Sequence, residues 1–441
     1  ACKAQVRLWV SSDAADNVDF STIQEAVDEA ATSTPEARIN ILPGTGPYVE
    51  NVVVDRGESF RFLGRDLGSG PPVVECAGSG NSVFDLRSAG VRPIVIRNLV
   101  LRGEELAAGQ RGVTSGPGIS TEMSTLRFEQ LGYGLHLGAG AHDVKRVTAD
   151  ATVGTGVLLD DAELTLRYAE FRGVAQALRM QGSSAEAEVE HLLVVGNGTG
   201  DGITNDSTLL GALVLRHSTL VDCGSAVSGN EGNSVIAHSI LWDNQSGVSG
   251  VSCLDIAWSD VQDVDCGGTN RSVDPLFVNA AAGDYHLQAA SPLLDLGPDP
   301  SGYDGIPCTD LDGEPRLRDH DGENLAQVDP GAFERENAAI TPPEVSGLLW
   351  VGPTTLAWAP VGVAARYHVY RAPLSTLGYS AFGTCEDGLD VTSTDATLTD
   401  TIVPPQGDGF YYEITAEDAT GAESTLGVGT CSERSNFIAC P

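Results

Sequence analysis

The sequence predicts an all-β protein that consists of a right-handed parallel β-helix with an N-terminal capping helix, followed by a small β-sandwich. A pair of residues, one small and one aliphatic, recurs every 21–25 residues between positions 112 and 248. The segment 90–265 has no sustained helical period, and the repeat itself stops near residue 341. A short period without helices is typical of a solenoid of strands, and its end marks a second domain.

Two motifs keep step along this solenoid. One alternates apolar and polar residues, as in Leu164–Tyr168, Leu213–His217 and Ile236–Ile240, which is the spacing of a β-strand. A coil of about 22 residues cannot bury a core by itself, so neighbouring coils must stack. Leucine-rich repeats share the period but need an LxxLxLxxN pattern that is missing, and ankyrin or tetratricopeptide repeats need helices. The other motif occurs at Gly112-Val113, Gly134-Leu135, Gly156-Val157, Ala177-Leu178, Gly202-Ile203, Ala226-Val227 and Gly247-Val248.

The N-terminal segment predicts a cap for the open end of the solenoid. Ser21 and Gln24 form an S-x-x-Q capping box, which predicts a short helix that begins there. Strands are expected at 39–42 and at 48–54. A helix across the end of a β-helix would cover strand edges that otherwise invite aggregation.

These patterns predict two domains. We expect the β-helix domain to span 1–338 and the β-sandwich to span 339–441. Within the β-helix domain, the N-terminal cap is 1–50, the coils are 51–270 and a closing segment is 271–338.

Composition argues against three classes of protein. Of the 441 residues, 41% are hydrophobic and 20% are charged, so the chain can bury a core and is not disordered. The net charge of −36 argues against a nucleic-acid partner, which needs a basic face. The longest apolar runs are far shorter than the roughly 20 residues that cross a bilayer, so we expect no membrane insertion.

The nine cysteines favour export. They include no CxxC pair, which argues against a zinc ribbon, and in an acidic, lysine-poor chain they favour disulfides formed outside the cytoplasm. Cys253 and Cys266 are close enough in sequence for a local disulfide. With its start at Ala1, we interpret the sequence as the mature form of an extracellular or cell-surface protein. Scattered buried thiols in a cytosolic protein are the alternative.

Two segments carry a family resemblance. The sequence "DFSTIQEAVDEA…INILPGTGPYVENVVV" in 19–54 resembles the opening of pectin-lyase-like proteins, which include pectin methylesterases and polysaccharide lyases. The sequences "DPLFVNAAAGDYHLQAASPLLDLG" and "DLDGEPR…VDPGAFE" in 274–334 resemble the end of secreted bacterial β-helix proteins of the choice-of-anchor Q domain type. The resemblance covers roughly 1–335, and it implies fold and export more than chemistry.

The last hundred residues resemble a different family. Leu356–Trp358, Tyr367–Tyr370 and Phe410–Ala416 are short, alternating strands that fit a β-sandwich. Their early Trp, Tyr-x-x-Tyr and late Tyr-rich segments resemble a fibronectin type III module. The closing "CSERSNFIACP" is similar to the ends of secreted proteins of predatory, gliding bacteria such as myxobacteria.

The catalytic residues that the resemblance implies are missing. A methylesterase of this fold needs two aspartates and an arginine, with one carboxylate attacking the ester and the other working as acid and base. Its Gln-Asp-Thr-Leu and Asp-Phe-Ile-Phe-Gly segments are absent. A lyase needs an aspartate cluster for calcium, and no such cluster faces the arginine-bearing segment 92–97. Asp160 and Asp161 are a lone pair that predicts a turn.

Basic residues recur at one position of the coils. Strands of successive coils lie about 4.8 Å apart, so these residues should form a cationic stripe interrupted by Glu190. Each basic residue precedes a residue that we expect to point inward; in the second coil, Arg127 precedes Phe128. Such a stripe would bind an anionic glycan or the acidic face of a partner, unless neighbouring acids neutralise it. The predicted ligand-binding residues are Arg97, Arg127, Lys145, Arg167 and Arg216.

Two further clusters suggest metal sites. Clustered carboxylates with glycine turns suit calcium, which takes six to eight oxygens, although an acidic surface loop is an equal alternative. His191, His217 and His238 should stack on three successive coils, as a ladder of partly buried rings or, less commonly, as a metal site. The predicted calcium ligands are Asp310, Asp312, Asp319 and Asp321, with Asp329 nearby.

Three functions compete on this basis. The first is a secreted or cell-surface, non-catalytic protein that acts in structure, self-assembly or adhesion and binds polysaccharide or copies of itself. The second is a polysaccharide lyase, a glycoside hydrolase or another carbohydrate-active enzyme of the pectin-lyase-like group. The third is a recognition module like those of tail spikes and adhesins. The missing catalytic residues and the C-terminal module favour the first.

Overall fold

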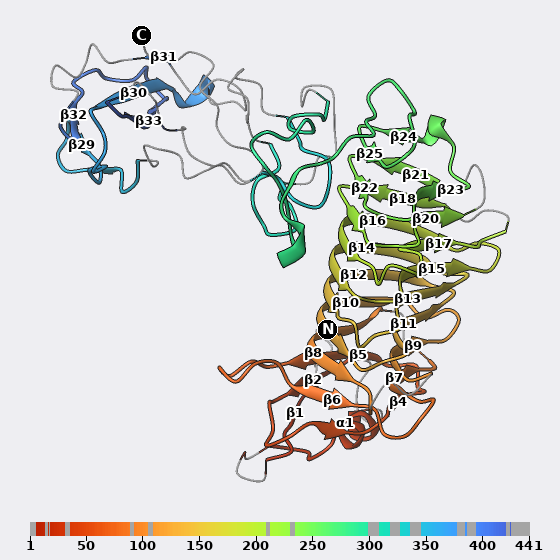
Figure 1. The fold of residues 1–441 in the computed structure, drawn as a ribbon. Helices are drawn as coiled ribbons and strands as arrows, with labels where there is room; N and C mark the ends of the chain where they lie inside the picture. Colours follow the sequence, from red (N-terminus) through yellow and green to blue (C-terminus); the bar gives the residue numbers. More distant parts are fainter. Residues whose placement is uncertain are drawn as a thin grey trace. The chain divides into compact units, whose positions relative to one another are not determined.

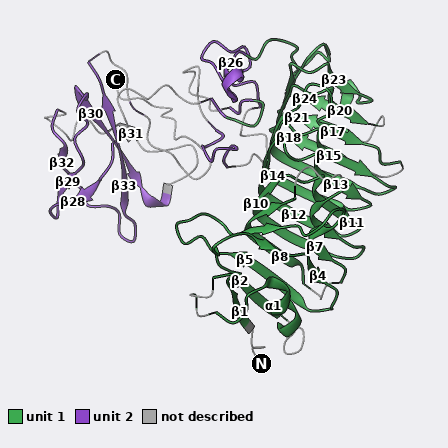
Figure 2. Ribbon diagram, turned by 60° about the horizontal axis from the view of Figure 1, so that its bottom comes forward, with its two compact units in different colours: residues 1–275, 330–333 green, residues 276–329, 334–441 purple. Residues whose placement is uncertain are grey.

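The computed structural model forms two compact units, which are described separately (Figure 2). The first unit consists of 1–275 and 330–333, and the second of 276–329 and 334–441. The described residues are 6–13, 16, 18–30, 36–88, 92–104, 109–208, 212–229, 234–298, 308–317, 327–335, 345–376, 384–385, 394–419 and 424.

The first unit is a parallel β-helix built from two sheets (Figure 1). The main path of sheet A is β1 (Val6–Val10), β2 (Glu36–Ile41), β5 (Ser59–Gly64), β8 (Ile94–Arg102), β10 (Thr121–Glu129), β12 (Ala141–Ala149), β14 (Glu163–Arg172), β16 (Glu186–Val195), β18 (Leu213–Arg216), β21 (Ser234–Ala237) and β24 (Ile256–Ala257). Its side branches are β3 (Tyr48–Val49), β6 (Val73–Glu75), β19 (Thr219–Val221), β22 (Ile240–Trp242) and β25 (Asp260–Val261). Sheet B contains β4 (Val52–Val54), β7 (Ser82–Leu86), β9 (Arg111–Ser115), β11 (Tyr133–Gly138), β13 (Thr155–Asp160), β15 (Gln176–Gln181), β17 (Ile203–Asn205), β20 (Ser225–Gly229) and β23 (Ser246–Ser249). The predicted fold class is confirmed.

Inward-pointing side chains explain the repeat of a small residue before an aliphatic one. The aliphatic residue of the repeat, such as Val113 or Leu135, is fully buried in every coil but the last, where Val248 is partly buried. The glycine before it faces the aromatic ring of Phe128: a Cβ on Gly112 or Gly134 would lie 3.0 Å from that ring. The same Cβ would lie within 2.6 Å of a carbonyl oxygen of the next coil. The repeat therefore records where the backbone must pass close to the core.

Helix α1 (Ile23–Ala30) covers the N-terminal end and buries its apolar side against the first coils. Its capping box lies one residue later than predicted. Thr22 Oγ1 accepts a hydrogen bond from Glu25 N at 3.2 Å, while Glu25 Oε2 accepts one from Thr22 N. Gln24 instead reaches β4, where its Oε1 accepts from Val53 N at 2.7 Å. A threonine with a glutamate three residues later satisfies the same rule as the predicted pair.

The later coils of the β-helix bind a segment from much farther along the chain. Pro330–Phe333 belongs to the first unit. Gly331 N donates to His238 O at 2.8 Å, and Ala332 N donates to Thr219 Oγ1 at 2.9 Å. This segment therefore packs beside Thr219 and His238. The short helix η1 (Cys253–Asp255) follows the last strand of sheet B.

The second unit contains a short hairpin and a β-sandwich. The hairpin pairs β26 (Phe277–Asn279) with β27 (Asp284–Leu287) around η2 (Ala280–Ala282). One sandwich sheet contains β28 (Leu349–Trp350), β29 (Thr355–Ala357) and β32 (Thr397–Thr399); the other contains β31 (Thr384–Cys385), β30 (Arg366–Pro373) and β33 (Phe410–Glu417), with η4 (Leu374–Thr376) after β30. Leu356, Trp358, Val369 and Ile414 pack between the sheets.

The finer statements about domain organisation stay predictions: the fibronectin type III resemblance, the choice-of-anchor Q type, the myxobacterial style and the boundary at residue 338. In the described residues, none of the helices has the length and apolar character that a bilayer crossing requires.

Candidate functional site

The strands of sheet A bend at one residue per coil, and this bend decides which side chains share a surface. At Tyr168 the backbone is left-handed, with φ of 58°. Side chains before the bend form one strip of the outer surface, and those after it form another. In coil order the residues at the bend are Asn98, Thr125, Arg146, Tyr168, His191, His217, His238 and Trp258.

Four of the five predicted cationic residues lie in one row of the first strip. They occupy the position immediately before the bend, where the strand register places one above another. Two other residues interrupt the row. In coil order it contains Arg97, Ser124, Lys145, Arg167, Glu190 and Arg216.

Arg127 lies on the far side of the bend, so its expected place in the stripe is wrong. Its partners in the register are Val100 and Thr148. The residue at the bend of β10 is Thr125, whereas Phe128 is an inward residue beyond it. Alternation of apolar and polar residues runs on both sides of the bend, and only the backbone shows which residue takes a positive φ.

Each of the predicted cations has a carboxylate partner, including Arg127. The row is therefore neutralised by neighbouring acids, which is the alternative that the sequence left open. Its role in ligand binding stays a prediction. The pairs are Arg97 with Glu122 (3.2 Å), Arg127 with Glu129 (2.9 Å), Lys145 with Asp143 (2.9 Å), Arg167 with Glu190 (3.3 Å) and Arg216 with Glu188 (3.0 Å).

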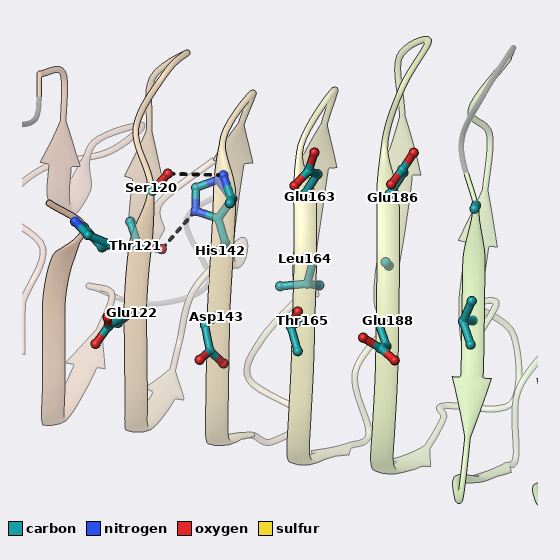
Figure 3. A pocket seen from close by; sticks show the side chains of 15 residues that line it. Ser120, Thr121, Glu122, His142, Asp143, Glu163, Leu164, Thr165, Glu186 and Glu188 are labelled. Atoms are coloured by element: carbon teal, nitrogen blue, oxygen red, sulfur yellow. Dashed lines mark hydrogen bonds between the residues drawn. The ribbon is translucent and has the colours of Figure 1, made fainter. Parts of the chain in front are cut away.

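A groove crosses the same strip next to this row (Figure 3). Its volume is about 640 Å³, and its lining runs from Pro93, just before β8, to Val214 in β18. Five inter-strand steps of about 4.8 Å give it a length on the order of 24 Å. We call it the acidic groove, because its charged lining consists of Glu122, Asp143, Glu163, Glu186 and Glu188.

The carboxylates of the acidic groove differ in their partners. Glu122, Asp143 and Glu188 pair with the adjacent cationic row. Glu163 and Glu186 are exposed register partners in β14 and β16, and neither carboxylate has a hydrogen-bond or ion-pair partner among the described residues. In Figure 3 they lie at the same level on adjacent strands. The groove therefore carries two carboxylates that are open to a ligand.

His142 forms part of the floor of the groove. It is buried, its Nδ1 lies 2.9 Å from Thr121 Oγ1, and its Nε2 lies 3.0 Å from Gly138 O. Burial lowers the pKa of His142, so the ring is neutral at pH 7. Its register neighbours in the lining are Leu164 and then Ala187, so this part of the groove is uncharged and the negative charge comes from the five acidic side chains.

The sequence pattern did not reveal this groove. Glu163 and Glu186 are 23 residues apart, which is one coil, and this spacing is the signal that could have identified them. The neighbouring pair Asp160 and Asp161 was the more conspicuous feature. Asp161 has φ of 54°, and its Oδ1 accepts backbone hydrogen bonds from Ser183 and Ser184, which agrees with the predicted turn.

The three predicted histidines form a stacked ladder at the bend, continued by Tyr168. Ring centroids are 4.7 Å apart from Tyr168 to His191, 5.7 Å from His191 to His217 and 4.9 Å from His217 to His238. The interplanar angles are 4°, 13° and 9°. Nearly parallel rings direct their nitrogen lone pairs along parallel planes, whereas ligands of one ion must converge on it. The geometry favours the ladder.

The predicted calcium residues are only partly described. Asp310 is buried; its Oδ1 accepts from Asp312 N at 3.0 Å, and its Oδ2 accepts from Glu334 N at 2.9 Å. These bonds give Asp310 a structural role. Among the described residues no group of three His, Cys, Asp or Glu side chains is placed to hold a metal. Calcium stays a prediction, since Asp319 and Asp321 lie outside the described residues.

The "DLDGEPR…VDPGAFE" motif builds a buried polar cluster around Arg316. The Arg316 side chain is 0% exposed, and its Nη1 donates to Glu334 Oε2 at 3.3 Å and to Asp329 O at 3.2 Å. Glu334 Oε1 accepts from Asp329 N at 2.8 Å. Burial raises the pKa of Glu334 well above its usual value. The charged residues of the motif thus have a structural role, while its Pro330–Phe333 part belongs to the first unit.

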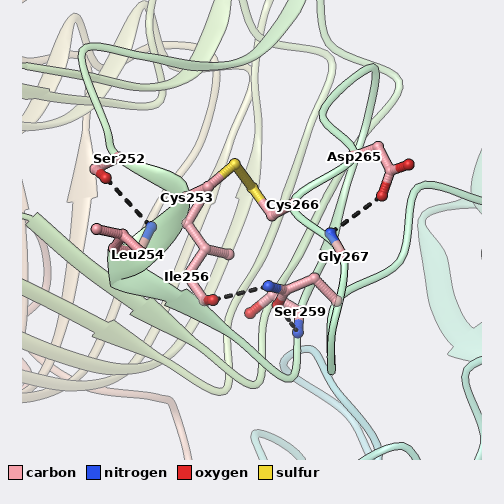
Figure 4. The surroundings of a disulfide bond; sticks show 9 residues. Ser252, Cys253, Leu254, Ile256, Ser259, Asp265, Cys266 and Gly267 are labelled. Carbon is pink, nitrogen blue, oxygen red and sulfur yellow. Dashed lines mark hydrogen bonds between the residues drawn. A yellow bond between two sulfur atoms is a disulfide. The ribbon is translucent and has the colours of Figure 1, made fainter.

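Cys253 and Cys266 form the disulfide that their spacing suggested (Figure 4). It ties η1 to the loop after β25 at the C-terminal end of the β-helix. Cys308 is also disulfide-bonded. Cys76 and Cys223 are buried thiols, and burial raises their pKa to about 11 and about 12. Neither is therefore a reactive thiolate at neutral pH.

Known proteins resemble this chain only weakly. No protein-family model and no curated protein matches the chain. Similar solved structures include a pectin methylesterase from carrot, which is 14% identical with a TM-score of 0.35; the match covers 57% of this chain and 85% of the carrot chain. Another is a pectin methylesterase from Aspergillus niger, 13% identical with a TM-score of 0.38, covering 60% of this chain and 90% of that chain.

Proposed function

We propose that this protein binds a polysaccharide chain in the acidic groove on sheet A. The observation that carries the proposal is a continuous groove across consecutive coils whose walls present Glu163 and Glu186 without partners among the described residues. A length on the order of 24 Å suits a chain molecule better than a compact ligand. Carboxylates accept hydrogen bonds from hydroxyl groups and attract amines, so the ligand is an uncharged or amino-bearing glycan.

Binding outside the cell is part of this proposal. The Cys253–Cys266 disulfide supports it, because such bonds persist in oxidising compartments. Adhesion, self-assembly and a structural role are compatible with glycan binding and stay predictions.

Calorimetric titration with chitosan oligosaccharides, xylan oligosaccharides and polygalacturonate tests the proposal. We expect the chitosan or xylan series to bind, and the double variant Glu163→Gln/Glu186→Gln to bind at least about tenfold more weakly, because charged hydrogen bonds contribute about 1.5–3 kcal/mol each. The control Asp160→Asn/Asp255→Asn removes two negative charges outside the groove and should leave affinity within about twofold. Equal losses in both variants, or binding of polygalacturonate alone, would contradict the proposal.

Hydrolysis of a glycosidic bond is the second candidate, and the pairing of Glu163 with Glu186 favours it. Glycosidases place an acid and a second carboxylate on either side of the scissile bond, about 5–5.5 Å apart in retaining enzymes. Carboxylates on adjacent strands start from a backbone spacing of about 4.8 Å. The release of reducing ends from the glycan that binds, lost in Glu163→Gln and in Glu186→Gln separately, would establish it. Binding without turnover in the unaltered protein would leave the groove as a binding site only.

A further inference from the structure

Four arginines gather on the outer face of the first coils, in the row of side chains that continues into the acidic groove. Arg7 pairs with Arg38, and Arg38 with Arg61, in the register of β1, β2 and β5, so three side chains stand in one row about 4.8 Å apart. Arg65 follows β5, and its side chain donates to Asn40 Oδ1 at 2.6 and 3.1 Å. We call Arg7, Arg38, Arg61 and Arg65 the arginine patch.

No carboxylate neutralises this patch in the part of the chain that the structure describes. None of the four arginines has a carboxylate oxygen within 4.0 Å there, whereas every cation of the row beside the groove has one. Burial, together with the charges of Arg65, Arg7 and Arg61, lowers the pKa of Arg38. Like charges on adjacent strands destabilise a sheet, and an anion between them would relieve that repulsion.

Trp9 stands beside the patch with an accessible face. It lies two residues after Arg7 on the same outward side of β1 and is 40% exposed. The Arg65 guanidinium carbon is 6.0 Å from its ring centroid. The nearby carboxylate of Asp19 accepts a hydrogen bond from Trp9 N at 2.9 Å, so it binds the backbone. An indole beside guanidinium groups offers a stacking surface for a sugar ring and donors for its anionic group.

The row of side chains that contains the arginine patch changes from positive to negative charge along the β-helix. Arg61 pairs with Val95, and Val95 pairs with Glu122 at the start of the acidic groove. A long polyanion running along the axis would meet these carboxylates, so the patch suits a short stretch of chain across β1, β2 and β5. Three guanidinium groups within about 10 Å, with a fourth beside them, match a polymer that carries more than one charge per sugar.

We infer that the arginine patch and Trp9 bind a sulfated polysaccharide, by bidentate guanidinium–sulfate contacts and stacking of a sugar on the indole. The site does not depend on the acidic groove. The net charge of −36 does not forbid it, because at 0.15 M ionic strength charges farther than about 8 Å are largely screened.

Binding of dextran sulfate, polygalacturonate and uncharged dextran to the full chain at about 0.15 M NaCl tests the inference. We expect dextran sulfate to bind more tightly than polygalacturonate, and uncharged dextran to bind least. The variant Arg38→Gln/Arg61→Gln should weaken dextran sulfate binding at least about tenfold. The control Arg97→Gln/Arg167→Gln makes the same charge change on the same face at paired residues and should stay within about twofold.

Single variants and a groove variant separate the arginine patch from the acidic groove and from a contact between copies of the chain. Trp9→Ala and Arg7→Gln alter exposed side chains and should each weaken binding about threefold or more, so the test holds even where the double variant fails to fold. Glu163→Gln/Glu186→Gln should leave dextran sulfate binding in place, so failure of the groove proposal is a separate result. Equal losses in patch and control variants, or polygalacturonate binding as tightly as dextran sulfate, would overturn the inference. So would a protein oligomer that only the patch variant dissociates, because the patch would then bind a second copy of the chain.

Discussion

Asp260 in β25 is a buried acid, and only one of its two carboxylate oxygens has a hydrogen-bond partner among the described residues. It is 0% exposed; its Oδ1 accepts a hydrogen bond from Val273 N at 2.9 Å, and its Oδ2 has no partner among the described residues. Burial raises the pKa of Asp260 to about 7, with a further contribution from Asp274. A carboxylate of this kind makes the stability of the fold depend on pH, because its charged form is less favourable in the folded chain than in water.

The direction of this dependence follows from the raised pKa. In the unfolded chain Asp260 loses its proton near 3.8, and in the folded chain near 7. Its contribution to stability is therefore complete below pH 3.8, declines as the pH rises to about 7, and is lost above it. Asp260→Asn cannot ionise, so relative to the unaltered protein it should gain on the order of 4 kcal/mol between about pH 4 and about pH 8. Urea unfolding of both proteins at a series of pH values measures this, and parallel pH profiles would contradict the assignment.

At the scale of elements, hydrogen bonds from distant parts of the chain hold α1 on the first coils and the segment 330–333 beside Thr219 and His238. At the N-terminal end, Glu50 accepts hydrogen bonds from Ile23 N and Gln24 N, both at 2.9 Å, which satisfies free N–H groups of α1. Burial nevertheless raises the pKa of Glu50. In the later coils, Thr219 and His238 hold the segment 330–333 by hydrogen bonds. Hydrogen bonds to the β-helix thus fix two segments that are distant in sequence from their partners.

A substitution of Gly331 tests how much the docking of the segment 330–333 contributes to stability. Its φ of 102° is unfavourable for other residues, and a Cβ there would lie 2.8 Å from Thr219 Oγ1 and 3.0 Å from Ile240 Cδ1. We expect Gly331→Ala to lower the free energy of unfolding by more than about 1 kcal/mol, measured by circular dichroism in urea. Gly118→Ala is the control: its φ is 79°, but a Cβ there meets nothing within 4 Å. If the two variants lose the same amount, packing of the segment 330–333 contributes nothing.

At the scale of the whole molecule, the period of the repeat was enough to predict the β-helix, since only stacked coils bury its apolar positions. The period could not locate the bend. Loop lengths vary between coils, so Arg127 and Phe128 were aligned with Arg97 and Asn98, whereas Ser124 pairs with Arg97 and Thr125 takes the positive φ. The acidic groove and the arginine patch depend on this register. Glu163 with Glu186, and Arg7 with Arg38, become neighbours only when coils are superposed residue by residue.

The net charge of −36 governs how the whole molecule responds to salt. Added salt weakens the surface ion pairs, which contribute only about 0–1 kcal/mol each, and it also screens the repulsion among 61 acidic residues. The surplus of negative charge makes the second effect larger. We therefore expect the Tm to rise between about 10 mM and about 300 mM NaCl, as measured by calorimetry at about pH 8. CaCl2 at the same ionic strength should raise it further only if calcium binds, and EDTA should reverse that extra rise. A Tm that falls with NaCl would mean that the paired rows on sheet A, and not the excess charge, set the electrostatic stability of the fold.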